Sequence, residues 1–188
     1  VHVTIVSPSG NTSGASLVII GESSMISSTY ANPTSSYNQF TEDRSGYRVE
    51  VGIESVKKSK DECIISVYAI NPYDKIAGIQ FKIMPPNVFS VEEVYGGRSK
   101  EKDFDIHFNE TGTILGFSMV ANTLDVSTTV SGPNKFKENI ILYIRAKYND
   151  IEKYLKDGSI EMECVLASKE GTVLPAKFVP FPFSEIKE

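Results

Sequence analysis

The stretch IAGIQFKIMPPN, at residues 76–87, decides the fold class of this chain. Apolar side chains occupy every second position, which is the pattern of a β-strand with one buried face. The apolar positions are Ile79, Phe81 and Ile83, and the polar positions between them are Gln80 and Lys82. The prolines that follow lack the amide hydrogen that a sheet ladder needs, so we predict that the strand ends at Met84. Gly78 predicts a β-bulge or a close backbone approach where the strand crosses from one sheet to the other.

Short alternating runs of the same kind, separated by turn residues, continue from Tyr47 to Phe183. They predict an all-β jelly-roll sandwich of about nine strands. In ECIISVYAI we expect two partly covered faces, formed by Cys63, Ile65, Val67 and Ala69 and by Ile64, Tyr68 and Ile70. In FDIHF we expect burial of Phe104, Ile106 and Phe108.

One segment, NDIEKYLKDG at residues 149–158, has a helical pattern instead. Asn149 suits the N-cap, Glu152 follows three residues later, and Gly158 suits the C-terminus. Ile151, Tyr154 and Leu155 would share one face. We therefore predict one short helix, and we interpret YGGRSK at residues 95–100 as a turn.

Residues 1–46 differ in composition from the rest of the chain. Ser, Thr, Gly, Asn and Pro make up more than half of them, which predicts an extended N-terminal arm. Two apolar runs around SPSGNTSG predict a β-hairpin within it, with the partner-binding residues Val1, Val3, Ile5, Leu17, Val18, Ile19 and Ile20. A lone hairpin is marginal in water, so we expect it to add to a sheet of this domain or of a neighbouring subunit. A linker without a role is the alternative.

The chain thus divides into the arm (1–46), the sandwich (47–183) and a charged C-terminal tail (184–188). Its 188 residues suit one domain with an appendage. The net charge of −5 leaves no basic surface for nucleic acid. No apolar run has the length of a membrane span. Because residue 1 is Val, we expect a processed product or part of something longer.

The two cysteines, Cys63 and Cys164, have no metal-binding spacing. Each lies on an apolar strand face, so we predict two buried thiols. The alternative is one disulfide between neighbouring strands.

The motifs IAGIQFKI, FSVEEVYGG, GTILGFSMVA and ENIILYIRAKY, in this order, resemble the cohesin module. The resemblance covers residues 47–183 and implies a nine-stranded jelly-roll sandwich that holds dockerin partners. Related motifs occur in carbohydrate-binding modules and in structural proteins of phages and large viruses. One departure is Met84-Pro85-Pro86-Asn87, where the family carries an aromatic-Asp-Pro segment. The arm is also foreign to a free cohesin and resembles the extended arms of virion proteins.

The stretch DFDIH is a candidate metal site, because Asp103, Asp105 and His107 alternate and would project from one face of a strand. A solvated outer face explains the same residues without a ligand, so we predict no metal and no cofactor. The sequence also lacks the nucleophile elbow, the HExxH helix and the phosphate loop, and its only histidines are His2 and His107. We therefore predict that the protein is not an enzyme.

Carbohydrate binding is a weaker hypothesis, because sugar rings stack on exposed aromatic side chains and this chain has no Trp. The tyrosines that could serve are Tyr30, Tyr37, Tyr73, Tyr95, Tyr143 and Tyr154. We predict a structural or interaction module in a larger assembly, most simply a virion component, whose arm binds protein subunits of the same assembly by β-augmentation. The alternative is an extracellular cohesin-type module that binds a dockerin-like partner on one sheet face.

Overall fold

The computed structural model describes residues 48–149 and 158–187. The predicted hairpin of the arm and residues 150–157 of the predicted helix lie outside these ranges. The described strands are β1 (Val49–Ser59), β2 (Glu62–Ile70), β3 (Gly78–Met84), β4 (Phe89–Tyr95), β5 (Asp105–Phe108), β6 (Thr113–Phe117), β7 (Ile140–Tyr148), β8 (Ser159–Ala167), β9 (Val173–Leu174), β10 (Ala176–Val179) and β11 (Phe181–Pro182). The described helices are α2 (Gly97–Glu101) and the 3-10 turns η1 (Lys137–Asn139) and η3 (Phe183–Glu185).

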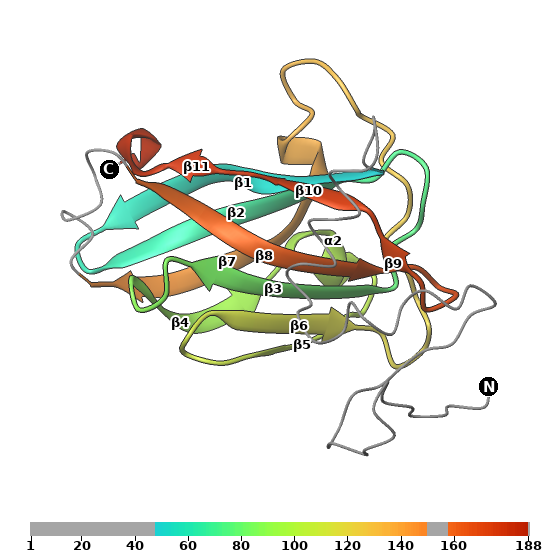
Figure 1. The fold of residues 1–188 in the computed structure, drawn as a ribbon, viewed down its shortest axis with the longest axis horizontal. Coiled ribbons are helices and arrows are strands. Elements are labelled where there is room, and N and C mark those ends of the chain that lie inside the picture. Colours follow the sequence, from blue (N-terminus) through green and yellow to red (C-terminus); the bar gives the residue numbers. More distant parts are fainter. Residues whose placement is uncertain (1–47, 150–157, 188) are drawn as a thin grey trace, which may run out of the picture. The chain divides into compact units, whose positions relative to one another are not determined.

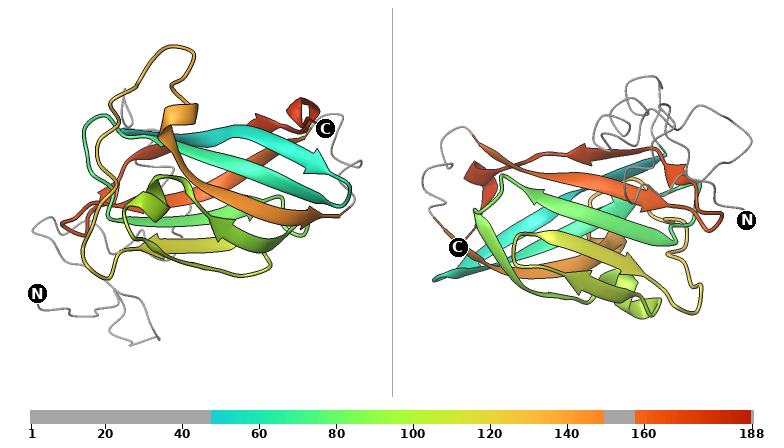
Figure 2. Two further views of the ribbon diagram at one scale, coloured as in Figure 1. Left: turned by 180° about the vertical axis from the view of Figure 1, so that it is seen from behind. Right: turned by 60° about the horizontal axis from the view of Figure 1, so that its bottom comes forward.

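The strands form two facing sheets, which confirms the predicted all-β sandwich (Figure 1). The five-stranded sheet has the order β10-β1-β2-β7-β4 and comes to the front when the molecule is seen from behind (Figure 2, left). The six-stranded sheet has the order β11-β8-β3-β6-β5, with β9 paired to β8. The strand pairs are antiparallel except for β1 with β10. In the described part of the chain, no helix is long and apolar enough to span a membrane.

The β3 strand confirms the alternation predicted for residues 76–87. Its inward residues Ile79, Phe81 and Ile83 are buried, and Gln80 and Lys82 between them are exposed. The strand ends at Met84, where the prolines begin. Burial of such side chains stabilises the fold by roughly 1.5–3 kcal/mol each.

The predicted role of Gly78 is wrong. Its pairing with Phe117 of β6 and Ala167 of β8 continues into both ladders without a register shift. A Cβ atom on Gly78 would lie 3.5 Å from the Ala167 Cβ, an ordinary contact. The strand stays within one sheet, and the register shifts occur in the other sheet, at Ile53/Ser55, Val67/Tyr68 and Val91/Glu93.

The chain changes sheets near its C-terminus instead, and this closes one side of the sandwich. Strand β9 pairs with one end of β8, β10 pairs with β1, and β11 returns to the other end of β8. Beyond β11, the buried Phe183 ring stacks on Phe89, with 6.3 Å between ring centroids. The Lys187 carbonyl then accepts a hydrogen bond of 2.8 Å from the Lys58 amide. Lys187, in the predicted charged C-terminal tail, therefore lies beside β1.

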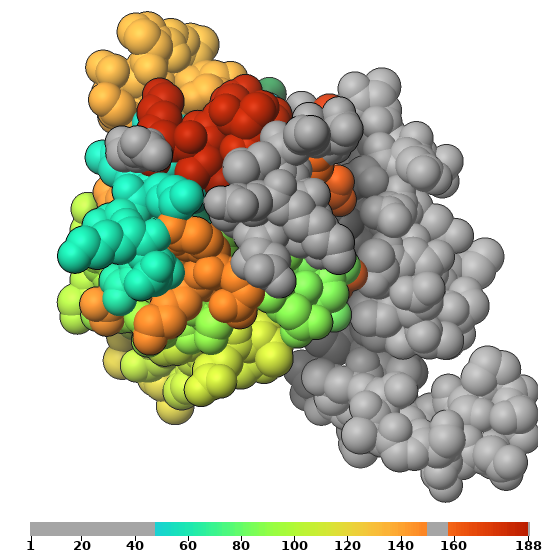
Figure 3. All heavy atoms as spheres, turned by 90° about the vertical axis from the view of Figure 1, so that its left-hand side faces the viewer, coloured from blue at the N-terminus to red at the C-terminus, as the bar shows by residue number. Residues whose placement is uncertain are grey.

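The structure tests three further predictions, which concern the YGGRSK stretch, the two faces of β2 and the burial of FDIHF. The YGGRSK stretch contains the helix α2 rather than only a turn, with Gly96 and Gly97 both at positive φ before it. Both faces of β2 are partly covered, as predicted: on the outward face Phe136, from the loop before β7, packs on the Tyr68 ring with 4.5 Å between ring centroids, whereas Ile64 is 36% exposed. This loop stands out from the two sheets (Figure 3). Of the three residues predicted to be buried in FDIHF, Phe104 is buried, Ile106 is half-buried and Phe108 is 41% exposed, because β5 is the last strand of its sheet.

Candidate partner-binding surface

The outward face of the six-stranded sheet is apolar at one end and charged at the other. Strand register places Leu115 of β6 beside Gln80 and His107, and Phe117 beside Gly78 and Asp105. The neighbouring strands β8 and β9 contribute Val165, Ala167 and Val173 to this face. Leu115 is 43% and Val173 is 41% exposed. Toward the other end, the outward residues are Lys82, Glu161 and Glu163.

The loop after β6 extends the apolar end of this face. A tight turn forms where the Ala121 amide donates to the Ser118 carbonyl at 3.1 Å, with Ala121 at φ 59°. Met119 and Val120 in this turn are 76% and 71% exposed. We define the apolar surface as Leu115, Phe117, Met119, Val120, Val165, Ala167 and Val173. Isolated exposed apolar residues are ordinary, but a group that continues across neighbouring strands into a loop is typical of an interaction site.

A buried polar network anchors the remainder of the loop between β6 and β7. The Arg98 guanidinium of α2 donates to the Ala69 carbonyl at 3.1 Å and to the Asn71 side-chain oxygen at 3.2 Å. It also donates to the Asp125 carbonyl, and the Asn71 side-chain amide donates to the same carbonyl at 2.9 Å. Burial lowers the pKa of Arg98, while Asp125 and Glu101 oppose that shift. One arginine therefore joins α2, the end of β2 and the loop.

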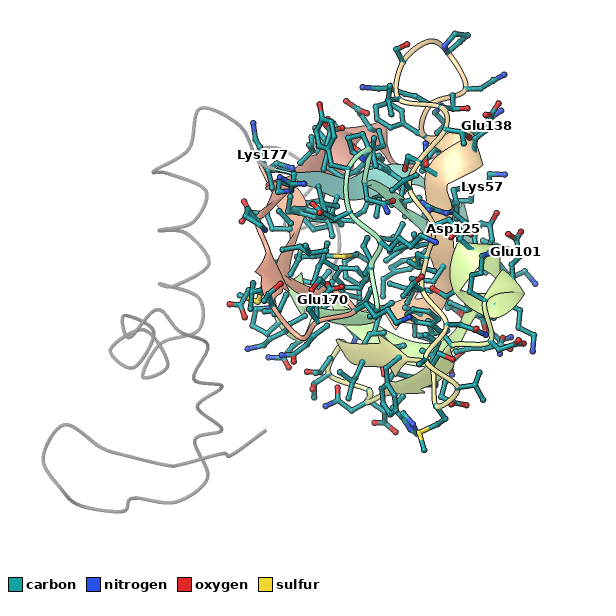
Figure 4. All side chains as sticks on the ribbon, turned by 90° about the vertical axis from the view of Figure 1, so that its right-hand side faces the viewer. Lys57, Glu101, Asp125, Glu138, Glu170 and Lys177 are labelled. Atoms are coloured by element: carbon teal, nitrogen blue, oxygen red, sulfur yellow. The ribbon has the colours of Figure 1, made fainter. Side chains whose placement is uncertain are left out.

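The Asp125 carboxylate forms two ion pairs at the exposed side of this network. Its carboxylate lies 2.9 Å from the Lys75 ammonium and 2.5 Å from the Lys102 ammonium, beside the helix that carries Glu101 (Figure 4). Hydrogen bonds from Lys102 and Lys75 lower the pKa of Asp125 to about 2. The three side chains are about half exposed, so water screens these pairs and they contribute little to stability.

The outward face of the five-stranded sheet has a different character. Tyr95 of β4 and Tyr143 of β7 stack with 5.6 Å between ring centroids, and Arg145 pairs with Glu93 at 3.1 Å beside them. Of the tyrosines considered for sugar binding, the structure brings these two together, whereas Tyr73 contacts Arg48. The others, Tyr30, Tyr37 and Tyr154, lie outside the described residues.

The predicted metal candidates do not form a site. Asp103 precedes β5 and has a φ of 51°, so it does not continue the alternation of Asp105 and His107. The His107 ring instead stacks on Phe117, with 6.0 Å between centroids. Within residues 48–149 and 158–187, no group of three or more His, Cys, Asp or Glu side chains is placed to hold a metal ion. The second histidine, His2, lies outside the described ranges.

The two cysteines are buried thiols, as predicted. Burial raises the pKa of the Cys63 thiol to about 12, with a smaller contribution from Glu62. A thiol needs its thiolate form to react, so Cys63 is inert as a nucleophile near neutral pH.

The apolar surface was not predicted from the sequence, although the sequence contains a signal for it. In TILGF, Ile114 is buried on the inner face, yet the alternate positions Leu115 and Phe117 are apolar as well. An apolar residue at an outward position breaks the usual polar alternation of a half-buried strand. Met119 and Val120 directly after the strand add to that departure.

No protein-family model matches this chain, and no curated protein matches its sequence. Among solved structures, it is similar to a non-cellulosomal cohesin of Archaeoglobus fulgidus, at 15% identity and a TM-score of 0.47, over 71% of this chain and 88% of that one. It is also similar to the third ScaB cohesin of R. flavefaciens in complex with a group 1 dockerin, at 12% identity and a TM-score of 0.47, over 72% and 93%. A third is the cohesin module from a family 33 glycoside hydrolase of Clostridium perfringens, at 12% identity and a TM-score of 0.42, over 70% and 92%.

Proposed function

We propose that this chain is a non-enzymatic protein-interaction module that binds a partner protein through the apolar surface. The observation that carries the proposal is the exposure of Leu115 and Val173 on one sheet face, continued by Met119 and Val120 in the adjoining loop. Covering apolar area stabilises a complex by roughly 25 cal/mol per Å² before the costs of association are subtracted.

The chemistry of this surface favours a protein over a sugar. Its members offer methyl groups and one half-buried ring rather than hydrogen-bonding groups, and sugar recognition needs both stacking and polar partners. Lys82, Glu161 and Glu163 border the apolar end with charges of both signs. An apolar centre with a polar rim is the usual anatomy of a protein–protein interface.

The test uses a dockerin module as the probe, because the sequence motifs resemble those of cohesins. Binding to the full chain is measured by isothermal titration calorimetry, and self-association by sedimentation velocity. Leu115→Glu is expected to weaken dockerin binding or self-association, whichever is measured for the wild-type chain, at least about tenfold, since it places a charge in the apolar centre. The matched control is Ile64→Glu, on the outward face of the other sheet and 36% exposed. If Leu115→Glu changes neither measurement, the apolar surface is not the partner site.

The N-terminal arm is the second proposed contact, and it carries the hypothesis of a larger assembly. Val1, Val3 and Ile5 would add to a neighbouring sheet, as would the apolar run at residues 17–20. A virion location belongs to this hypothesis, and an extracellular location to the dockerin-binding one. Sedimentation velocity on the full chain and on its Ile5→Lys variant tests the arm. Equal sedimentation of the two at all concentrations would contradict it.

A further inference from the structure

Within the described residues, the outer edge of β5 has no strand beside it. The side near β1 and β8 is closed by the segment from β9 to β11. On the other side, the edge of β4 is shielded: its Val91 amide donates to the Glu110 carbonyl at 3.1 Å, and the ladder is irregular there. Strand β5 forms the other edge on that side, at the bottom of Figure 1 and toward the viewer in Figure 2, right. No backbone hydrogen bond within the described ranges joins its outer edge to another segment.

This edge also leaves part of the inner apolar layer uncovered. Register pairs Phe108 with Ile114 and Ile106 with Gly116, so both β5 residues belong to the inner face. Ile114 is completely buried, whereas Phe108 is 41% exposed. The difference has a geometric cause, because β6 has strands on both sides and β5 has one. A further strand beside β5 would supply the missing cover.

The chain itself contains a segment with the pattern that such a strand needs. VHVTIV, at residues 1–6, alternates Val1, Val3 and Ile5 with His2 and Thr4. In a strand paired with β5, the first three would face inward, over Ile106 and Phe108. His2 and Thr4 would then lie outward beside Asp105 and His107, the polar outward residues of β5.

We propose that β5 accepts residues 1–6 of a second copy of this chain as an added edge strand. This inference rests on the assembly role proposed for the arm and names its acceptor. The arm joins the sandwich at β1 of the five-stranded sheet, beside the edge strand β10, whereas β5 is the edge strand of the six-stranded sheet on the opposite side of the sandwich. Main-chain hydrogen bonds to β5 would hold the strand, and the cover over Phe108 would set its register.

The test measures self-association of the full chain by sedimentation velocity and backbone amide exchange of Asp105–Phe108 by NMR. Above the association concentration, these amides are expected to exchange at least about tenfold more slowly than in the dilute monomer. Phe108→Lys is expected to weaken association at least about tenfold, as is Ile5→Lys. Ile64→Lys, on the five-stranded sheet, is the matched control. Phe108→Ser serves as a milder variant if Phe108→Lys lowers the thermal midpoint.

The outcomes separate the acceptor from the arm. If Ile5→Lys abolishes association and neither Phe108 variant weakens it, the arm has another acceptor and the inference is overturned. If the wild-type chain stays monomeric, and its β5 amides exchange fast at every concentration, the assembly role of the arm falls as well. If the β5 amides are already protected in the dilute monomer and Ile5→Lys removes that protection, the strand comes from the same chain and the second-copy proposal is wrong.

Discussion

Gly97, at the start of α2, occupies both a conformation and a space that other residues tolerate poorly. Its φ is 62°, and a Cβ atom there would lie 2.5 Å from the carbonyl carbon and oxygen of Ile141. Those atoms belong to the backbone of a central strand and cannot move aside cheaply. Gly132 has a similar φ of 85°, but nothing lies within 4 Å of its Cβ position. Substitutions at Gly97 and Gly132 can therefore distinguish the cost of backbone strain from the cost of steric overlap.

Gly97→Ala is therefore expected to lower the free energy of unfolding by more than about 2 kcal/mol, since it combines both effects. Gly132→Ala adds only the cost of the left-handed conformation, about 1–2 kcal/mol. Urea denaturation followed by circular dichroism measures both values. Equal losses for the two variants would mean that β7 accommodates the added methyl group.

At the scale of an element, α2 acts through its arginine rather than through its own stability. A five-residue helix is too short to persist alone in water. Arg98 joins it to buried groups, including the Asn71 side chain, which is itself inaccessible to solvent. The Asn139 side-chain amide donates to the carbonyls of Thr129 and Lys135 at 2.6 Å and 2.7 Å and stabilises the loop before β7. The chain between β6 and β7 is thus held by side chains that cap backbone groups.

Arg98→Met is expected to lower the free energy of unfolding by about 2–3 kcal/mol or more, because it removes a charged donor from three acceptors around the end of β2. Lys100→Met, at an exposed position of the same helix, should change it by less than about 0.5 kcal/mol. Thermal and urea unfolding of the two variants provide the comparison. A loss at Lys100 as large as that at Arg98 would assign the effect to the helix and not to the network.

For the sandwich as a whole, closure depends on a segment near the C-terminus. Strands β9 to β11 connect the two sheets, and Phe183 packs beneath them against Phe89 of β4. Phe183 is almost completely buried, although it lies close to the end of the chain. Phe183 therefore completes the core.

Phe183→Ala is expected to lower the free energy of unfolding by roughly 3–5 kcal/mol, the usual effect of removing a buried aromatic ring. Ser184→Ala, at the exposed neighbouring position, is the control and should be near neutral. Guanidinium unfolding monitored by circular dichroism distinguishes them. A near-neutral Phe183→Ala would show that the closing segment contributes little to the core.

The sequence by itself determined the fold class and the inner faces of the strands. Period-2 alternation identified Ile79, Phe81 and Ile83 as buried, and the missing amide hydrogens of two prolines ended β3 at Met84. Both are local effects, because side-chain direction and hydrogen-bonding capacity depend on neighbouring residues alone. The burial of the Cys63 and Cys164 thiols was predicted from the same alternation.

Tertiary structure alone decided which strands lie at an edge and which outward faces stay uncovered. Phe108 alternates as Ile114 does, but only the position of β5 at the end of its sheet leaves the ring exposed. Asp103 departs from the spacing of Asp105 and His107 because the turn before β5 takes it to positive φ. Leu115 and Val173 come to one sheet face through the register of strands far apart in the chain. Strand order and register depend on long-range pairing, which the local pattern does not contain.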